Sequence, residues 1–188
     1  MMETMDKGDA LLLVDVQIDF CPGGALPLNE GDEVVPVLNR WLEVANEKGI
    51  PVFASRDFHP LSHMSFAECG GLWPVHCLQE SEGAAFHPEL KLPAETVLVT
   101  KGTRFDQDQN SAFDATGLAT QLQRDGIHRL WIGGLALDVC VLATVLDACK
   151  LGFETQLILD GTRPVTPEGG EKALTEMRLA GAVILEGG

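Results

Sequence analysis

Basic residues are scarce in this sequence. Among its 188 residues, 13 Lys and Arg stand against 28 Asp and Glu, which gives a formal net charge of −15 at pH 7. A chain this acidic lacks the positive field that attracts nucleic acid or anionic lipid without sequence preference. We therefore expect small-molecule partners, and neither a nucleic acid nor a membrane.

Long hydrophobic runs and paired cysteines are also missing. No apolar stretch approaches the roughly 20 residues that cross a bilayer, and the acidic segment MMETMDKGDALLLVDV does not have the composition of a secretory signal peptide. The five cysteines are an odd number without a CxxC pair, which argues against a disulfide framework, a redox motif and a zinc ribbon. Together these absences predict a reduced, cytoplasmic setting.

The hydrophobic pattern indicates repeated βα units around a parallel sheet. At 45% hydrophobic content, 188 residues suffice for one sizeable core, so we expect a single domain over residues 1–188. Short leucine-rich or β-branched runs alternate with segments of helical periodicity. The predicted strands are 10–15, 50–55, 96–100, 128–132, 155–159 and 182–185, and the predicted helices are 34–45, 113–124, 139–151 and 168–179.

One long irregular connection, about 57–95, interrupts this alternation and is rich in Pro, Gly and His. Loops of that length inside a compact domain are usually functional. This one carries Asp57, His59, His63, Trp73 and His76. One carboxylate with two or three imidazoles suits Zn²⁺, Fe²⁺ or Mn²⁺, with positions left open for water or substrate. The alternative is that these histidines are solvated surface residues.

Four polar groups follow predicted strands. Asp15, Asp57 and Lys101 lie at or just beyond the carboxyl ends of three of them, and Cys140 lies in the run GGLALDVCV, between a fourth strand and a helix. Ligands of open parallel sheets bind at this edge. The N–H groups and dipole of a helix start favour a thiolate over a thiol and can hold an oxyanion beside the sulfur. Otherwise Cys140 is a small buried hydrophobe, the common state of a free cysteine.

Asp, Lys and Cys together make a hydrolytic triad. A carboxylate can take the proton of the thiol and later give one to a leaving amine, while an ammonium between them favours both anions. Asp138 is predicted to cap the helix by accepting a hydrogen bond from the N–H of Val141. The N–H groups of Ala136 and Cys140 would then be free to stabilise an oxyanion.

Several ordered motifs now resemble one family. The segments LLLVDVQIDFCPGGAL, DFHPLSHMSF, LWPVHC, KGTRFDQDQNSAF and GLALDVCV are similar to those of the isochorismatase-like cysteine hydrolases and, among them, of the nicotinamidase and pyrazinamidase group. The resemblance covers nearly the whole chain. It implies a three-layer α/β/α fold with a central, mostly parallel six-stranded sheet, within which 57–95 is a metal-binding loop region.

The resemblance also implies roles for individual residues. Asp15 would be the general base and acid, Lys101 its electrostatic partner and Cys140 the nucleophile. The backbone of Ala136 and Cys140 would form the oxyanion hole, with a cis peptide bond just before Ala136. The implied metal ligands are Asp57, His59 and His76, and Phe20 and Trp73 would flank an aromatic ring whose nitrogen the metal binds.

Two positions depart from the family pattern. Leu137 stands where members commonly have Thr, so a hydroxyl hydrogen bond is missing at that turn. His63 follows His59 by four residues, whereas some members place an additional ligand at another spacing. We expect His63 to be a pocket residue that reaches the metal only through water.

The expected activity is hydrolysis of nicotinamide, and of pyrazinamide, to the acid and ammonia through a thioester, with one divalent metal, zinc before iron or manganese. One alternative is a related amidohydrolase acting on carbamoyl or ureido substrates. Another is a non-catalytic α/β binding module with a structural zinc. The substrate would be a small aromatic amide, and the sequence leaves open whether the protein is a homo-oligomer.

Overall fold

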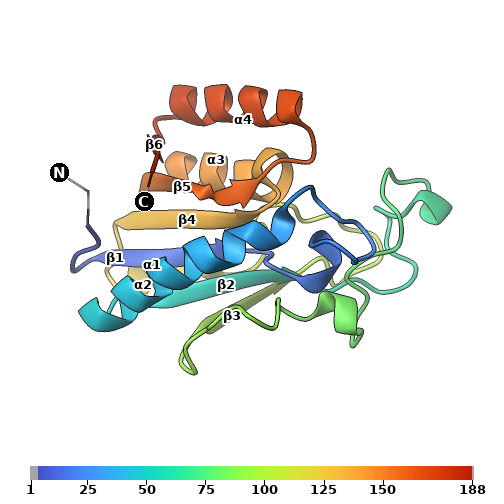
Figure 1. The fold of residues 1–188 in the computed structure, drawn as a ribbon, viewed down its shortest axis with the longest axis horizontal. Coiled ribbons are helices and arrows are strands. Elements are labelled where there is room, and N and C mark those ends of the chain that lie inside the picture. Colours follow the sequence, from blue (N-terminus) through green and yellow to red (C-terminus); the bar gives the residue numbers. More distant parts are fainter. Residues whose placement is uncertain (1–3, 188) are drawn as a thin grey trace.

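A six-stranded sheet forms the centre of the molecule. The computed structural model describes residues 4–187, so residues 1–3 and 188 of the predicted domain lie outside it. The strands lie in the order β3-β2-β1-β4-β5-β6, and every neighbouring pair is parallel (Figure 1). The predicted α/β/α fold with a mostly parallel sheet is confirmed. The strands are β1 (Asp9–Val14), β2 (Val52–Asp57), β3 (Val97–Lys101), β4 (Arg129–Leu135), β5 (Glu154–Arg163) and β6 (Val183–Leu185).

Helices cover both faces of the sheet. The four α-helices are α1 (Val34–Lys48), α2 (Leu118–Arg124), α3 (Leu142–Lys150) and α4 (Pro167–Ala180). Alternate residues of β1 point to opposite sides: Leu11 and Leu13 join the core under α1, whereas Leu12 joins the core under the other three helices. Because parallel strands are buried on both faces, they read as continuous apolar runs such as ALLLV.

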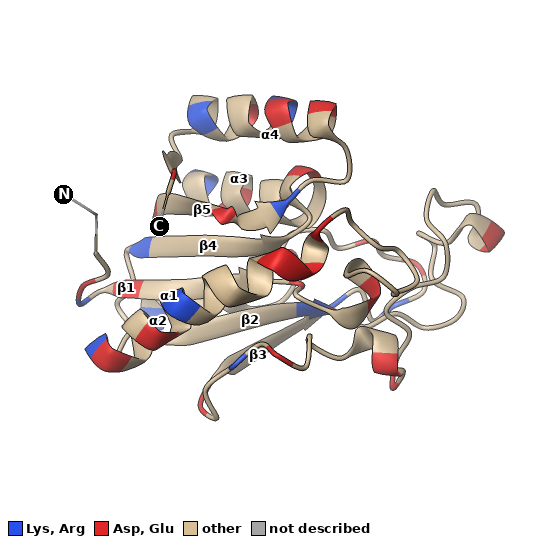
Figure 2. Ribbon diagram, in the orientation of Figure 1, with Lys and Arg blue, Asp and Glu red and all other residues tan. Residues whose placement is uncertain are grey.

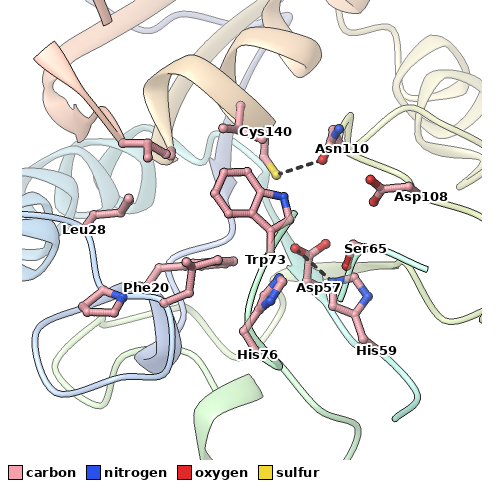
Figure 3. A pocket seen from close by; sticks show the side chains of 15 residues that line it. Phe20, Leu28, Asp57, His59, Ser65, Trp73, His76, Asp108, Asn110 and Cys140 are labelled. Atoms are coloured by element: carbon pink, nitrogen blue, oxygen red, sulfur yellow. Dashed lines mark hydrogen bonds and ion pairs between the residues drawn. The ribbon is translucent and has the colours of Figure 1, made fainter. Parts of the chain in front are cut away.

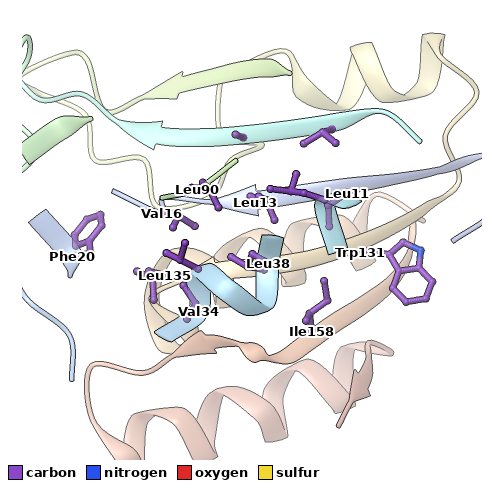
Figure 4. Packing of buried hydrophobic residues seen from close by; sticks show 14 of the residues in the cluster. Leu11, Leu13, Val16, Phe20, Val34, Leu38, Leu90, Trp131, Leu135 and Ile158 are labelled. Atoms are coloured by element: carbon purple, nitrogen blue, oxygen red, sulfur yellow. The ribbon is translucent and has the colours of Figure 1, made fainter. Parts of the chain in front are cut away.

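Helix α1 packs closely on one face of the sheet. Leu38 of α1 lies beside Leu11, Leu135 and Ile158 (Figure 4). The sheet itself is tightest at Gly134, which has φ of 128° and where a Cβ would fall 2.0 Å from the carbonyl oxygen of Val14. Only glycine allows β4 to approach β1 this closely. This close approach lies directly before Asp15, which follows β1, and shortly before the turn that carries Cys140 after β4.

Some predicted boundaries are wrong. The second helix begins at Leu118 rather than at 113, because the Thr116 hydroxyl donates to the carbonyl of Ala112 and Gly117 takes a left-handed φ of 77°. Side-chain bonding of this kind competes with helix formation. The third predicted helix starts earlier, with a π-helical turn at Leu137–Val141 that runs into α3. The fifth strand continues to Arg163 instead of ending at 159.

The long connection between β2 and β3 lies beyond the carboxyl ends of the strands, at the right of Figure 1, and contains two short 3₁₀ turns, Ala67–Cys69 and Glu82–Ala84.

Acidic residues are spread over the helices and loops, with the basic ones scattered among them (Figure 2). In the part of the chain that the structure describes, no helix is long and apolar enough to cross a membrane.

Candidate active site

Lys101 is at the centre of a buried cluster at the carboxyl edge of the sheet. Its ammonium, 1% exposed, donates to Asp15 Oδ2 at 2.8 Å and to Asp57 Oδ1 at 2.6 Å, and lies 3.7 Å from Cys140 Sγ. Acceptor atoms of Asp15, Asp57 and Cys140 lie within 4.8 Å of one another. The ammonium fills the space among them. The structure thus brings the predicted triad of Asp15, Lys101 and Cys140 together, with Asp57 as a fourth member of the cluster.

Asp15 is held by its backbone and by a second donor. Its φ is 49°, a left-handed conformation that is uncommon outside glycine and is found at functional sites. The hydroxyl of Ser55 donates to Asp15 Oδ1 at 2.7 Å, so both carboxylate oxygens have a partner. Sequence reasoning missed Ser55, although it is the only polar side chain in the run IPVFAS. In the sheet, Ser55 pairs in register with Val14 on β1.

Burial sets the proton affinities in this cluster. It raises the pKa of Asp15, an effect that the Lys101 charge opposes but does not cancel. It also raises the pKa of the Cys140 thiol well above its ordinary value, again against the Lys101 charge. Burial alone would lower the pKa of Lys101, but Asp15 and Asp57 raise it well above the usual range. Burial therefore favours the protonated thiol, against the expected preference of a helix start for a thiolate.

The turn before Cys140 carries the predicted cis peptide bond, between Leu135 and Ala136. The chain then enters the π-helical turn, in which the N–H of Val141 donates to the carbonyl of Ala136 at 3.0 Å. Asp138 therefore does not cap its own helix, which corrects the prediction. Its carboxylate instead accepts from the N–H of Val165 at 2.7 Å, on the segment that leads into α4.

Leu137, the residue that departs from the family pattern, is buried in the core under α3 and α4 and lies against Gly170. The turn is thus supported by apolar packing at this position.

Asp57, His59 and His76 form a second buried group beside the first. One ligand atom of each lies within 4.8 Å of the others. The Nδ1 atom of His59 is 2.7 Å from the carbonyl oxygen of Gly102, and that of His76 is 2.7 Å from the carbonyl oxygen of Pro74. A carbonyl accepts, so both Nδ1 atoms carry hydrogen, which leaves Nε2 as the ring nitrogen of each histidine that can bind a metal. This outer support is the usual arrangement for metal-binding imidazoles, and the donor set fits a divalent metal.

Asp57 is also fixed from the opposite side. Gln17, fully buried, donates from Nε2 to the carbonyl of Asp57 at 2.7 Å and accepts from the N–H of Asp57 at 2.9 Å. Burial alone would raise the pKa of Asp57, but Lys101 and His59 lower it well below the ordinary range, so the carboxylate stays ionised. Sequence reasoning missed Gln17, which follows Asp15 by two residues in the VDVQ segment.

His63 is not a pocket residue, contrary to expectation. Its ring stacks on that of His59 with centroids 3.8 Å apart, and both ring nitrogens have partners: Nδ1 lies 2.7 Å from Ser65 Oγ and Nε2 lies 3.0 Å from the carbonyl oxygen of Gln107. Phe66 packs edge-on against His59 and His76. His63 and Phe66 therefore support the histidine pair from behind.

A cavity joins the two groups. Cys140 lies at one end and His59 and His76 lie at the other, while Asp57 belongs to both groups. The indole of Trp73 lies between the two ends and Phe20 lies to one side (Figure 3). Phe20 also packs on the His76 ring at 5.7 Å. The structure thus places both predicted aromatic residues in the cavity wall. The wall also contains residues that sequence reasoning missed, and no spacing rule pointed to them: Leu26, Leu28, Ser65, Asp108, Asn110, Val139 and Val165.

Comparisons with known proteins identify the family of this chain. The isochorismatase domain model matches residues 9–187. The nicotinamidase of Escherichia coli is 41% identical, with 93% of each chain covered. The crystal structure of Pyrococcus horikoshii pyrazinamidase in complex with zinc has a TM-score of 0.93 and 44% identity, covering 96% of this chain and 99% of that one. The structure of PnC1 from L. infantum in complex with nicotinate has a TM-score of 0.91 and 34% identity, covering 99% and 96%. The chain therefore belongs to the isochorismatase-domain family.

Proposed function

We propose that this protein is an amidase that hydrolyses nicotinamide to nicotinate and ammonia, and that it accepts pyrazinamide as well. The observation that carries the proposal is the cavity itself, which has a buried thiol with a carboxylate and an ammonium at one end and a metal-competent triad at the other. A small aromatic amide with a ring nitrogen presents complementary groups at its two ends. The names of the E. coli, P. horikoshii and L. infantum relatives support the same activity.

In the first half of the reaction, Asp15 takes the proton of the Cys140 thiol while the sulfur attacks the carboxamide carbon. The oxyanion that forms is held by the backbone N–H groups of Ala136 and Cys140. The C–N bond then breaks, Asp15 returns the proton to the leaving nitrogen, and ammonia departs from a thioester on Cys140. The raised pKa of Asp15 suits it to both proton transfers.

In the second half, Asp15 takes a proton from water, whose oxygen attacks the thioester carbon. The C–S bond breaks, the sulfur recovers a proton and nicotinate is released. Lys101 stays charged throughout, because its two carboxylate partners raise its pKa, and it keeps Asp15 in place beside the sulfur.

At the opposite end, Asp57, His59 and His76 would hold one divalent metal, and we propose zinc, the metal named for the P. horikoshii structure. When bound, the metal offers a coordination position to the ring nitrogen of the substrate. Phe20 and Trp73 flank the ring, which orients the carboxamide toward Cys140.

Ammonia release from a panel of amides, with and without a chelator, tests the proposal. Nicotinamide and pyrazinamide should release ammonia. A chelator should raise KM for both amides, and added Zn²⁺ should return KM to its original value. Release from carbamoyl or ureido compounds, but not from nicotinamide, would establish the related amidohydrolase instead. If no amide is hydrolysed and the chelator unfolds the protein, the chain is a binding module with a structural metal.

A further inference from the structure

Asn110 is a polar side chain of the cavity for which the reaction described above has no role. It lies on the loop between β3 and α2, and its Oδ1 atom is 4.0 Å from Cys140 Sγ (Figure 3). Lys101 approaches the same sulfur from the buried side, at 3.7 Å, whereas Asn110 is exposed and approaches it from the open side of the cavity. A substrate amide at the thiol would therefore meet Asn110.

The loop that carries Asn110 is anchored on both sides of it. Gln109 is buried, accepts from the N–H of Gly102 at 2.9 Å and donates to the carbonyl of Asp114. The N–H of Ala112 donates to Thr144 Oγ1 at 3.0 Å, and the Thr144 hydroxyl donates in turn to the carbonyl of Cys140 at 2.7 Å. The Thr144 hydroxyl thus links the backbone of the Asn110 loop to the backbone of the nucleophile, which holds the two backbone segments next to each other.

Distances at the thiol allow Asn110 to reach the nitrogen of the scissile amide. In a productive complex the carboxamide carbon lies about 3–3.5 Å from the attacking sulfur. An acceptor that is 4.0 Å from that sulfur can therefore lie at hydrogen-bond distance, about 3 Å, from the attached nitrogen.

A primary carboxamide presents one oxygen acceptor and two N–H donors. The oxygen is held by the backbone N–H groups of Ala136 and Cys140 in the proposed mechanism, and Asp15 faces the nitrogen from the buried side. One N–H then still needs an acceptor on the open side, where Asn110 Oδ1 lies.

We infer that Asn110 is a specificity-determining residue, which accepts a hydrogen bond from the amino group of the substrate and so selects primary amides over esters of the same ring acid. This inference rests on the proposed amidase function. An ester oxygen has no hydrogen to donate, so an ester gains nothing from Asn110 Oδ1.

The test compares two substrates in the metal-loaded enzyme. Nicotinate formation from nicotinamide and from methyl nicotinate would be measured for the parent and for Asn110→Leu, which keeps the side-chain volume and removes the acceptor. We expect kcat/KM for the amide to fall about tenfold, the effect of one lost hydrogen bond, and kcat/KM for the ester to change less than about twofold. Asp106→Asn is the matched control, because Asp106 lies on the same loop, is paired with Arg104 and is absent from the cavity wall; it should change neither value.

A binding measurement gives the same answer without turnover. In the Cys140→Ala background, Asn110→Leu should weaken nicotinamide binding about tenfold relative to methyl nicotinate, as measured by calorimetry. An equal fall for both substrates, or no fall for the amide, overturns the assignment, because Asn110 would then serve the thiol, the oxyanion or nothing. A parent enzyme that releases no ammonia from nicotinamide would instead refute the amidase function itself.

Discussion

The two ends of the cavity are built from different parts of the chain. At the thiol end, Asp15 and Lys101 lie at the ends of β1 and β3, and Cys140 lies in the turn that follows β4. At the imidazole end, His59 and His76 come from the long loop and are oriented by the carbonyls of Gly102 and Pro74. One end is thus part of the sheet edge, and the other is assembled by loop contacts.

Their electrostatics differ as well. The thiol end holds one ammonium between two carboxylates, all three buried, so the loss of one charge leaves another without its partner. The imidazole end relies on histidines whose Nδ1 atoms donate to backbone carbonyls. We therefore expect substitutions at the thiol end to reduce kcat, and substitutions at the imidazole end to act mainly on KM.

The largest effect should come from Cys140→Ala. Because this change removes the nucleophile and leaves Asp57, His59 and His76 in place, ammonia release should fall by at least about 10⁴-fold while the metal content is unchanged. Cys149→Ala is the matched control, since Cys149 is half-buried further along α3 and is not part of the cavity wall; its activity should match the parent. Substantial residual ammonia release from Cys140→Ala would show that the thiol is not the nucleophile.

The thiol end could be predicted from the sequence because its residues follow apolar strands. The runs ALLLV, IPVFAS and TVLVT locate the strand ends, and parallel strands bring their carboxyl ends to one edge. The pattern did not predict the polar residues that hold Asp15 and Asp57 in place. Ser55 was predicted only as part of a strand. Gln17 lies in an irregular segment, and it donates to carbonyl groups that are 40 and 67 positions away in the sequence.

The imidazole end was harder to predict. The spacing of Asp57, His59 and His76 suggested a metal site. It did not show that His63 lies behind the cavity, bonded to Ser65, whereas His59 and His76 line the cavity. His63 and His59 stack because the loop folds back on itself, and no periodicity describes that path. Asn110 was missed for the same reason, since its place beside Cys140 depends on the bonds of Gln109 and Thr144.

A smaller effect, and one on a different kinetic constant, is expected from His59→Ala. It removes one of three metal-competent side chains, so the metal content should fall and KM for nicotinamide should rise about 10–100-fold, with kcat reduced much less. His128→Ala, an exposed histidine at the opposite end of the sheet, is the control and should change neither. An unchanged KM together with unchanged metal content would mean that the imidazole end does not hold the metal.

The smallest effect should come from Ser55→Ala, and it should appear mainly as a shift of the pH profile. The Ser55 hydroxyl donates to the ionised form of Asp15 and so lowers the pKa of that carboxyl, against the larger effect of burial that raises it. Without the hydroxyl the pKa of Asp15 rises further. Because the general base works when deprotonated, the acid limb of kcat/KM should move to higher pH, while the plateau above it falls only a few-fold.

Ser65→Ala provides the comparison from the imidazole end. Its hydroxyl contacts His63 rather than Asp15, so KM should change and the acid limb should stay where it is in the parent. A rate profile of kcat/KM against pH for the three proteins distinguishes the two ends directly. If both serine variants moved the limb equally, Asp15 would not be the group that titrates, and the separation of proton transfer from ring binding would be wrong.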